Sequence, residues 1–118
     1  MIEEIQFTSD FWCIVLPIIL CFIDVITGYV NAWRKNKVSS KKMRNGLSKK
    51  FGEMVLCFLG WLFYLSFGIK LMAGFISAYI SLMEVTSIFE NLANLGVPIP
   101  NIIKSKVNNL KEDLDKEE

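Results

Sequence analysis

The chain of 118 residues contains no histidine, and its three cysteines show no C-x-x-C spacing. The absence of histidine removes the usual general base and the commonest metal ligand. Cys13, Cys21 and Cys57 all fall in apolar stretches, so we expect free, buried thiols rather than a disulfide or a metal site. We expect no cofactor, and we predict that the chain is not an enzyme.

Charged residues are almost absent from two long stretches. Residues 11–33 contain one acid, Asp24, and residues 51–92 contain only four charged residues. A chain that commits most of its apolar residues to such runs cannot also bury a soluble core. The predicted fold class is therefore an all-α integral membrane protein that forms a single membrane domain over residues 1–118.

The lengths of the two stretches predict about three transmembrane helices. Residues 11–33 would form a helix of about 34 Å, enough to cross the hydrocarbon core. Residues 51–92 would form a helix of about 63 Å, which is twice the core thickness, so we expect a break marked by Gly68, Lys70 and Gly74. This gives spans at residues 51–67 and 73–92. The third span is marginal, because its apolar residues contribute about −2 to −5 kcal/mol to insertion and its two acids nearly cancel that gain.

Acidic residues are absent between the first two spans, where residues 34–50 hold eight basic residues. The positive-inside rule predicts that this segment is a cytoplasmic loop, with residues 1–10 external and the tail 96–118 cytoplasmic. Residues 1–10 carry acids and no basic residue, unlike a signal peptide, so we expect the first span to remain attached. Within the loop, Ser40 is a candidate cap for a short helical turn that Gly46 ends.

The basic loop also suggests partners. Anionic lipid headgroups should attract it, whereas nucleic acid is disfavoured because no aromatic residue interleaves with the charges. Its basic residues are Arg34, Lys35, Lys37, Lys41, Lys42, Arg44, Lys49 and Lys50.

Polar residues in the first and third spans gather on one face of each helix. At 100° per residue, they occupy about one third of the circumference. The stripe residues are Asp24, Thr27, Gly28 and Asn31 in the first span, and Ser77, Ser81, Glu84, Ser87 and Asn91 in the third. One interpretation is helix packing within a subunit. The other is that several subunits assemble with the stripes inward around water, and the two are compatible.

The segment after the third span predicts a stop and then a short amphipathic tail. Gly96, Pro98 and Pro100 end any helix. Beyond them, apolar residues recur at i, i+4, i+7 and i+11, namely Ile103, Val107, Leu110 and Leu114. A solvated helix and an oligomer contact both remain open for this tail.

Three groups of residues together resemble a known family. The first is D-x-x-T-G, at Asp24, Thr27 and Gly28. The second lies in the loop, at Ser39–Ser40, Gly46–Leu47 and Lys49–Lys50. The third is E-x-x-S-I-x-E-N, at Glu84, Ser87, Ile88, Glu90 and Asn91, followed by Leu95–Gly96 and Pro98-x-Pro100.

This pattern, from about residue 14 to residue 102, is similar to that of the toxin-secretion/phage-lysis holin family, which includes the clostridial toxin-export holins. The resemblance implies a multi-pass protein of the bacterial cytoplasmic membrane that forms homo-oligomers. It also implies sudden lesions that release an endolysin or a large toxin, and an antiholin as a possible partner. It assigns no catalytic residues, so Gly46, Lys50, Glu90, Gly96 and Pro100 are carried over as motif positions only.

Two other functions remain open on the sequence. One is a small proton-coupled oligomeric transporter in which Asp24 or Glu84 titrates. The other is a non-conducting regulator, such as an antiholin, which can share every motif with the protein it inhibits.

Overall fold

The computed structural model describes residues 7–116, which form four α-helices and no strand. The helices are α1 (Asp10–Arg34), α2 (Ser40–Phe67), α3 (Lys70–Asn94) and α4 (Asn101–Lys116). The first three are long and apolar enough to cross a membrane. The predicted all-α membrane fold is therefore confirmed. Residues 1–6 of the predicted external amino terminus, and residues 117–118 of the tail, lie outside the described residues.

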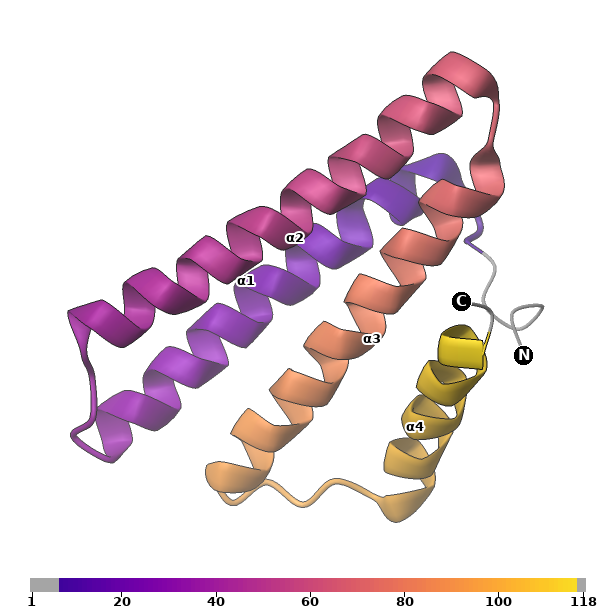
Figure 1. Cartoon of the computed structure of the whole chain (residues 1–118). Helices are drawn as coiled ribbons and strands as arrows, with labels where there is room; N and C mark the ends of the chain where they lie inside the picture. Colours follow the sequence, from indigo (N-terminus) through magenta and orange to yellow (C-terminus); the bar gives the residue numbers. More distant parts are fainter. Residues whose placement is uncertain (1–6, 117–118) are drawn as a thin grey trace.

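The helix α3 organises the fold, because it packs against each of the other three helices. The chain reverses direction between α1 and α2 and again between α2 and α3, so α1 and α3 point the same way (Figure 1). Arg34, at the end of α1, donates a hydrogen bond of 3.1 Å to the Leu95 carbonyl just after α3. At the opposite end, Lys70 lies 3.5 Å from Asp10. These contacts place the basic end of α1 beside the carboxyl end of α3.

The predicted break in the second apolar stretch is sharper than expected. Gly68 ends α2 in the left-handed conformation, with φ of 74°, and its N–H bonds to the Tyr64 carbonyl at 2.8 Å. Glycine adopts this conformation without a steric penalty, so one residue reverses the chain. The prediction that Lys70 and Gly74 belong to the break is wrong, because α3 begins at Lys70 and contains both.

The predicted basic loop over residues 34–50 is wrong in its second half. The helix α2 begins at Ser40, after Ser39, whose hydroxyl accepts from the Lys42 N–H at 3.4 Å. Gly46 does not end it, because one glycine costs a helix only about 1 kcal/mol and the surrounding Lys, Arg, Met and Leu favour helix. The helix α2 therefore extends about 42 Å and carries basic residues on its first turns.

The helix α2 approaches α3 closely at Gly60, which is buried. A β-carbon added there would lie 3.0 Å from the Ile76 Cδ1 atom and 3.4 Å from the Ala73 Cα atom. Glycine is needed at this position because the two backbones approach one another. Elsewhere α2 is largely exposed, as expected of a helix that lies against lipid.

The carboxyl-terminal tail folds back along α3. Gly96, with φ of 93°, and the prolines that follow separate α3 from α4 as predicted. The helix α4 packs against α3. Among its apolar residues Leu114 is 1% exposed, whereas Ile103 is 46% and Ile102 83% exposed. The amphipathic tail thus makes an intramolecular contact.

Candidate functional site

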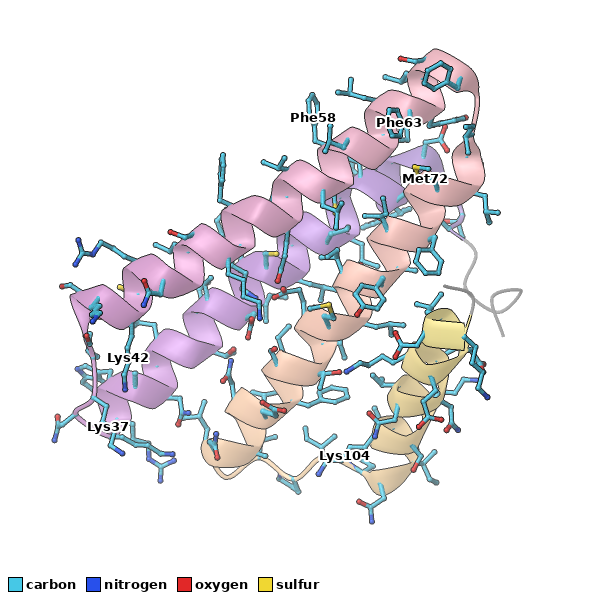
Figure 2. All side chains as sticks on the ribbon, in the orientation of Figure 1. Lys37, Lys42, Phe58, Phe63, Met72 and Lys104 are labelled. Carbon is cyan, nitrogen blue, oxygen red and sulfur yellow. The ribbon has the colours of Figure 1, made fainter. Side chains whose placement is uncertain are left out.

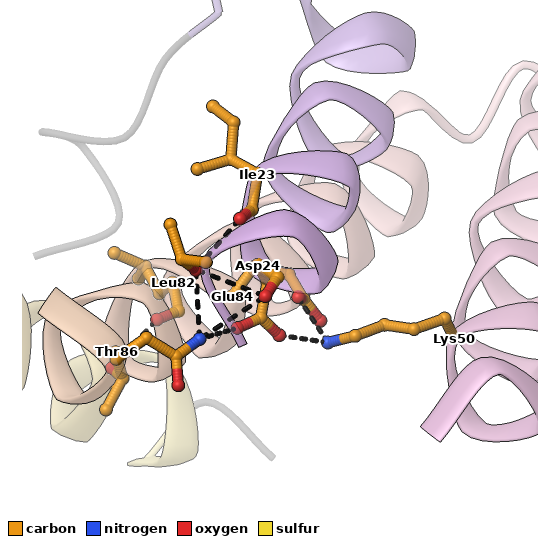
Figure 3. A network of polar contacts seen from close by, with 8 residues as sticks. Ile23, Asp24, Lys50, Leu82, Glu84 and Thr86 are labelled. Atoms are coloured by element: carbon orange, nitrogen blue, oxygen red, sulfur yellow. Dashed lines mark hydrogen bonds and ion pairs between the residues drawn. The ribbon is translucent and has the colours of Figure 1, made fainter. Parts of the chain in front are cut away.

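The polar stripes of α1 and α3 meet at the centre of the fold (Figure 3). Asn91 of α3 donates hydrogen bonds to the Asp24 Oδ1 atom at 2.9 Å and to the Thr27 hydroxyl at 3.0 Å. Thr27 in turn donates to the Ile23 carbonyl at 2.9 Å, one turn earlier in α1. Gly28 lies at this contact, and an added β-carbon there would make an ordinary contact of 3.5 Å with the Asn91 amide nitrogen.

Lys50 of α2 joins the same cluster. Its ammonium nitrogen lies 2.5 Å from the Asp24 Oδ2 atom and also forms an ion pair with the Glu84 Oε2 atom. The Glu84 side chain is 1% exposed and the Lys50 side chain 18% exposed. One cation therefore links two carboxylates from different helices. We call Asp24, Lys50, Glu84 and Asn91 the polar cluster.

The polar cluster explains how two acids are tolerated in helices of this kind. On the insertion scale, one charged residue at a helix centre costs about 2.5 to 3.5 kcal/mol. Pairing removes much of that cost, but it makes the partners depend on each other. Removing one partner of a buried ion pair typically costs about 3 to 5 kcal/mol. Because Lys50 bridges Asp24 and Glu84, it fixes α2 to both α1 and α3.

A second polar contact between α1 and α3 lies near the amino-terminal ends of these two helices. The Ser77 hydroxyl donates to the Cys13 carbonyl, and the Cys13 thiol lies 3.9 Å from the Ala73 carbonyl. Cys13 and Cys21 are free and buried as expected, whereas Cys57 is only half-buried. Polar contacts between α1 and α3 therefore extend from Cys13 to Thr27 of α1.

Three buried polar atoms near the stripes have no hydrogen-bond partner within the described residues. They are the Ser81 hydroxyl, the Asn31 Oδ1 atom and the Glu53 Oε2 atom. Ser81 and Asn31 are stripe residues, and Glu53 lies one turn after Lys50 on α2. An unsatisfied buried polar group costs free energy, so these atoms are the places where water or another chain would be most favourable.

The other predicted residues lie around the cluster or away from it. Ser87, Asn91 and Glu90 line a cavity of about 380 Å³ between α1 and the start of α2. Glu90 itself is exposed, as are Gly46, Gly96 and Pro100. Of the carried-over motif positions, the structure brings only Lys50 into the polar cluster. The basic residues other than Lys50 are exposed.

Cys21, Glu53 and Glu84 have possible metal-ligating atoms that all lie within 4.8 Å of one another. Glu84, however, already pairs with the Lys50 ammonium. A second cation beside Glu84 would meet the positive charge of Lys50 directly, so we assign no metal site to these residues.

The role of Lys50 was missed by sequence reasoning, which placed it in a loop facing lipid headgroups. The prediction failed because α2 extends backwards from residue 51, and that extension turns the Lys50 side chain into the bundle. A signal was present in the two acids of the spans, since intramembrane acids are usually paired. Lys50 is the basic residue that directly precedes an apolar run.

Three span-length helices joined by a buried ionic cluster define a helical membrane protein. The sequence pattern of the bacteriophage holin family matches residues 4–112. The chain belongs to this family. It is also 31% identical over 100 residues to the uncharacterized protein YqxH of Bacillus subtilis (strain 168), across 83% of this chain and 71% of that protein. No solved structure is significantly similar.

Proposed function

We propose that this chain is a holin that accumulates in the bacterial cytoplasmic membrane, associates with copies of itself and opens lesions that release an endolysin or a large toxin. The observation that carries the proposal is the matched packing of the two polar stripes within one chain. The packed form hides Asp24 and Glu84, while large apolar side chains cover much of the outside. A chain in this packed form can remain in the lipid bilayer without opening a lesion.

The same stripes suit a second, assembled state. If the helices separate, Asp24, Glu84 and Asn91 can face water or the stripe of a neighbouring chain, where charged groups in spans are tolerated. The unpartnered Ser81 and Asn31 atoms favour such an exchange, because water or a neighbouring subunit would satisfy them. The polar cluster is then a contact made within one chain before assembly and between chains or with water afterwards.

The position of α4 supports a rearrangement on insertion of α3. Lys111 of α4 donates to the Thr86 hydroxyl at 3.4 Å. Thr86 is four residues, or about 6 Å, from the middle of α3, so a spanning α3 would place this contact inside the hydrocarbon core. Seven of the sixteen residues of α4 are charged, and hydrocarbon would not accept them. We therefore propose that α4 leaves α3 when α3 spans the membrane.

The proposed orientation follows from the basic residues. Three spans with the α1–α2 connection in the cytoplasm place residue 116 in the cytoplasm, whereas an α3 that lies on the surface places it outside. After replacement of the three native cysteines, a Lys116→Cys variant distinguishes these cases. Labelling of that cysteine by an impermeant reagent in intact cells contradicts the three-span form.

The function is tested by the size of what crosses the membrane. The chain is expressed in a bacterium together with a cytoplasmic peptidoglycan hydrolase that lacks a signal sequence. We expect normal growth for a period, then sudden loss of membrane potential and rapid lysis. Expressed alone, the chain should stop growth without prompt lysis, because the wall stays intact.

The buried Asp24–Lys50–Glu84 cluster also favours a second candidate, a small proton-coupled transporter, because intramembrane acids often carry protons. A transporter rocks around a midplane site and passes no folded protein. A hydrolase that stays inside cells whose membranes contain abundant chain contradicts the holin proposal. If the chain then delays lysis by another holin, it is a regulator.

A further inference from the structure

A groove runs between α1 and α2, with α3 as its floor. Its volume is about 510 Å³, within the range of small-molecule sites. Ile18 and Phe22 of α1 and Phe51 and Phe58 of α2 form its walls, and Ala73 of α3 lies at its floor. The groove exists because α1 and α2 both pack on α3 and touch each other little.

The 380 Å³ cavity at the basic end of the bundle adjoins the groove. The two share Val25, Leu47 and Lys50 in their linings. Lys37 and Lys42 line the outer cavity, and both lie at the end where α1 connects to α2 (Figure 2). The apolar groove thus lies beside two exposed lysines and one exposed acid, Glu90. Lys50 contributes little charge to this path, because it is paired with Asp24 and Glu84.

The length of α2 sets the depth of these features in a bilayer. At about 42 Å, α2 matches the full bilayer thickness of about 40 to 45 Å, headgroups included. A hydrocarbon core of about 30 Å accommodates about 20 helical residues, so the part of α2 from Leu47 to its end lies within the core. Lys42 then lies at the headgroup level. The α2 residues that line the groove, from Leu47 to Trp61, extend about 21 Å, which is longer than one hydrocarbon leaflet of about 15 Å.

We propose that this groove is a binding site for one phospholipid with an anionic headgroup. Its phosphate lies between Lys37 and Lys42, and one acyl chain lies along Phe51 toward Phe58. The two lysines at the mouth and the apolar walls of the groove favour this ligand over a helix from a second chain. The site depends on insertion of the chain with its basic end in the headgroup layer. It does not depend on lesion formation, so its failure and that of the proposed function are separable.

The test measures the quenching of one tryptophan by brominated phospholipids in vesicles. The reporter is Phe51→Trp in a chain whose three native tryptophans are replaced by phenylalanine. Two vesicle preparations are compared. One contains brominated phosphatidylglycerol and unbrominated phosphatidylcholine, and the other contains brominated phosphatidylcholine and unbrominated phosphatidylglycerol. We expect the reporter to prefer the anionic lipid by about 10- to 30-fold, since each lysine near an anionic headgroup contributes a factor of about five. A Val55→Trp reporter, outside the groove, should show little preference.

Charge removal at the mouth tests the assignment of the headgroup. Lys37→Gln with Lys42→Gln should lower the preference to that of the Val55→Trp reporter. Lys41→Gln with Lys49→Gln removes the same charge from residues that do not line the groove, and should leave the preference unchanged. Phe58→Trp serves as a second reporter if Phe51→Trp does not give a helical, membrane-inserted chain.

Two results would overturn the site. One is equal quenching of the groove reporter by both lipids, or a preference that survives the loss of Lys37 and Lys42. The other is weak quenching by both lipids at a reporter that is inserted, because the groove is then filled by another helix.

Discussion

Lys50 and Asp24, 26 residues apart in the sequence, lie 2.5 Å apart across the interface between α2 and α1. The same ammonium group pairs with Glu84 of α3, so one side chain connects all three span-length helices. In lipid, where no water screens or solvates the pair, such a contact holds the packed form together while both partners remain in place. The predictions below separate this contact from other features of the fold.

The first prediction concerns Lys50. Lys50→Met keeps the length of the side chain but leaves Asp24 and Glu84 without their counter-charge, which should weaken the packed form by up to about 3 to 5 kcal/mol. We expect membrane depolarisation and lysis to occur earlier at equal protein levels. Lys49→Met, one residue away and exposed, is the control. If depolarisation and lysis occur at the wild-type time in both variants, the ion pairs of Lys50 do not stabilise the packed form.

The second prediction concerns Glu84. Glu84→Leu should make α3 insert better by about 3 kcal/mol on the insertion scale, yet delay or abolish lesions, because the stripe loses its central polar group. Asp24 remains to pair with Lys50, so the packed form persists. Membrane fractionation measures insertion, and depolarisation measures function. Glu90→Leu removes an exposed acid of the same helix and should keep the timing. If the Glu84→Leu variant depolarises the membrane at the wild-type time, the polar stripe serves only in helix packing.

The third prediction concerns the contact between α4 and α3. Leu114→Lys places a charge at a site that is 1% exposed and should release α4. If release precedes the spanning of α3, lysis should come earlier in this variant. Ile102→Lys introduces the same charge at a position that is 83% exposed, and it should behave as the wild type. A delay in Leu114→Lys, or equal timing in the two variants, would show that α4 docking does not restrain α3.

The fourth prediction concerns the close approach of α2 to α3. Gly60→Leu would press a side chain against Ile76 and Ala73, and should destabilise the bundle by about 1 to 3 kcal/mol. Gly52→Leu should have no such cost, because a β-carbon at Gly52 meets nothing within 4 Å. Thermal unfolding in detergent micelles, followed by circular dichroism, compares the two. Equal melting temperatures would mean that the helices do not meet at Gly60.

The sequence alone determined the helices and their apolar character. The length of each apolar stretch predicted three span-length helices, because helical rise and membrane thickness fix that relation. Gly68 and the Gly96–Pro100 segment marked two helix ends, because left-handed glycine and proline act through local backbone geometry. The period of the stripes also put Asp24 and Glu84 each on a polar face, since that depends only on 100° per residue.

Tertiary structure decided which groups those faces meet. Lys50 pairs with Asp24 and Glu84 only because α2 packs on α3 with this face inward, and that packing does not follow from a local pattern. The packing of α4 on α3 depends likewise on how the chain turns after Pro100. Pairings between distant residues arise from helix packing, in which a small residue such as Gly60 sets how near two backbones come. Local sequence determines a helix and its polar face, but only the packed bundle brings a cation from one helix to the acids of two others.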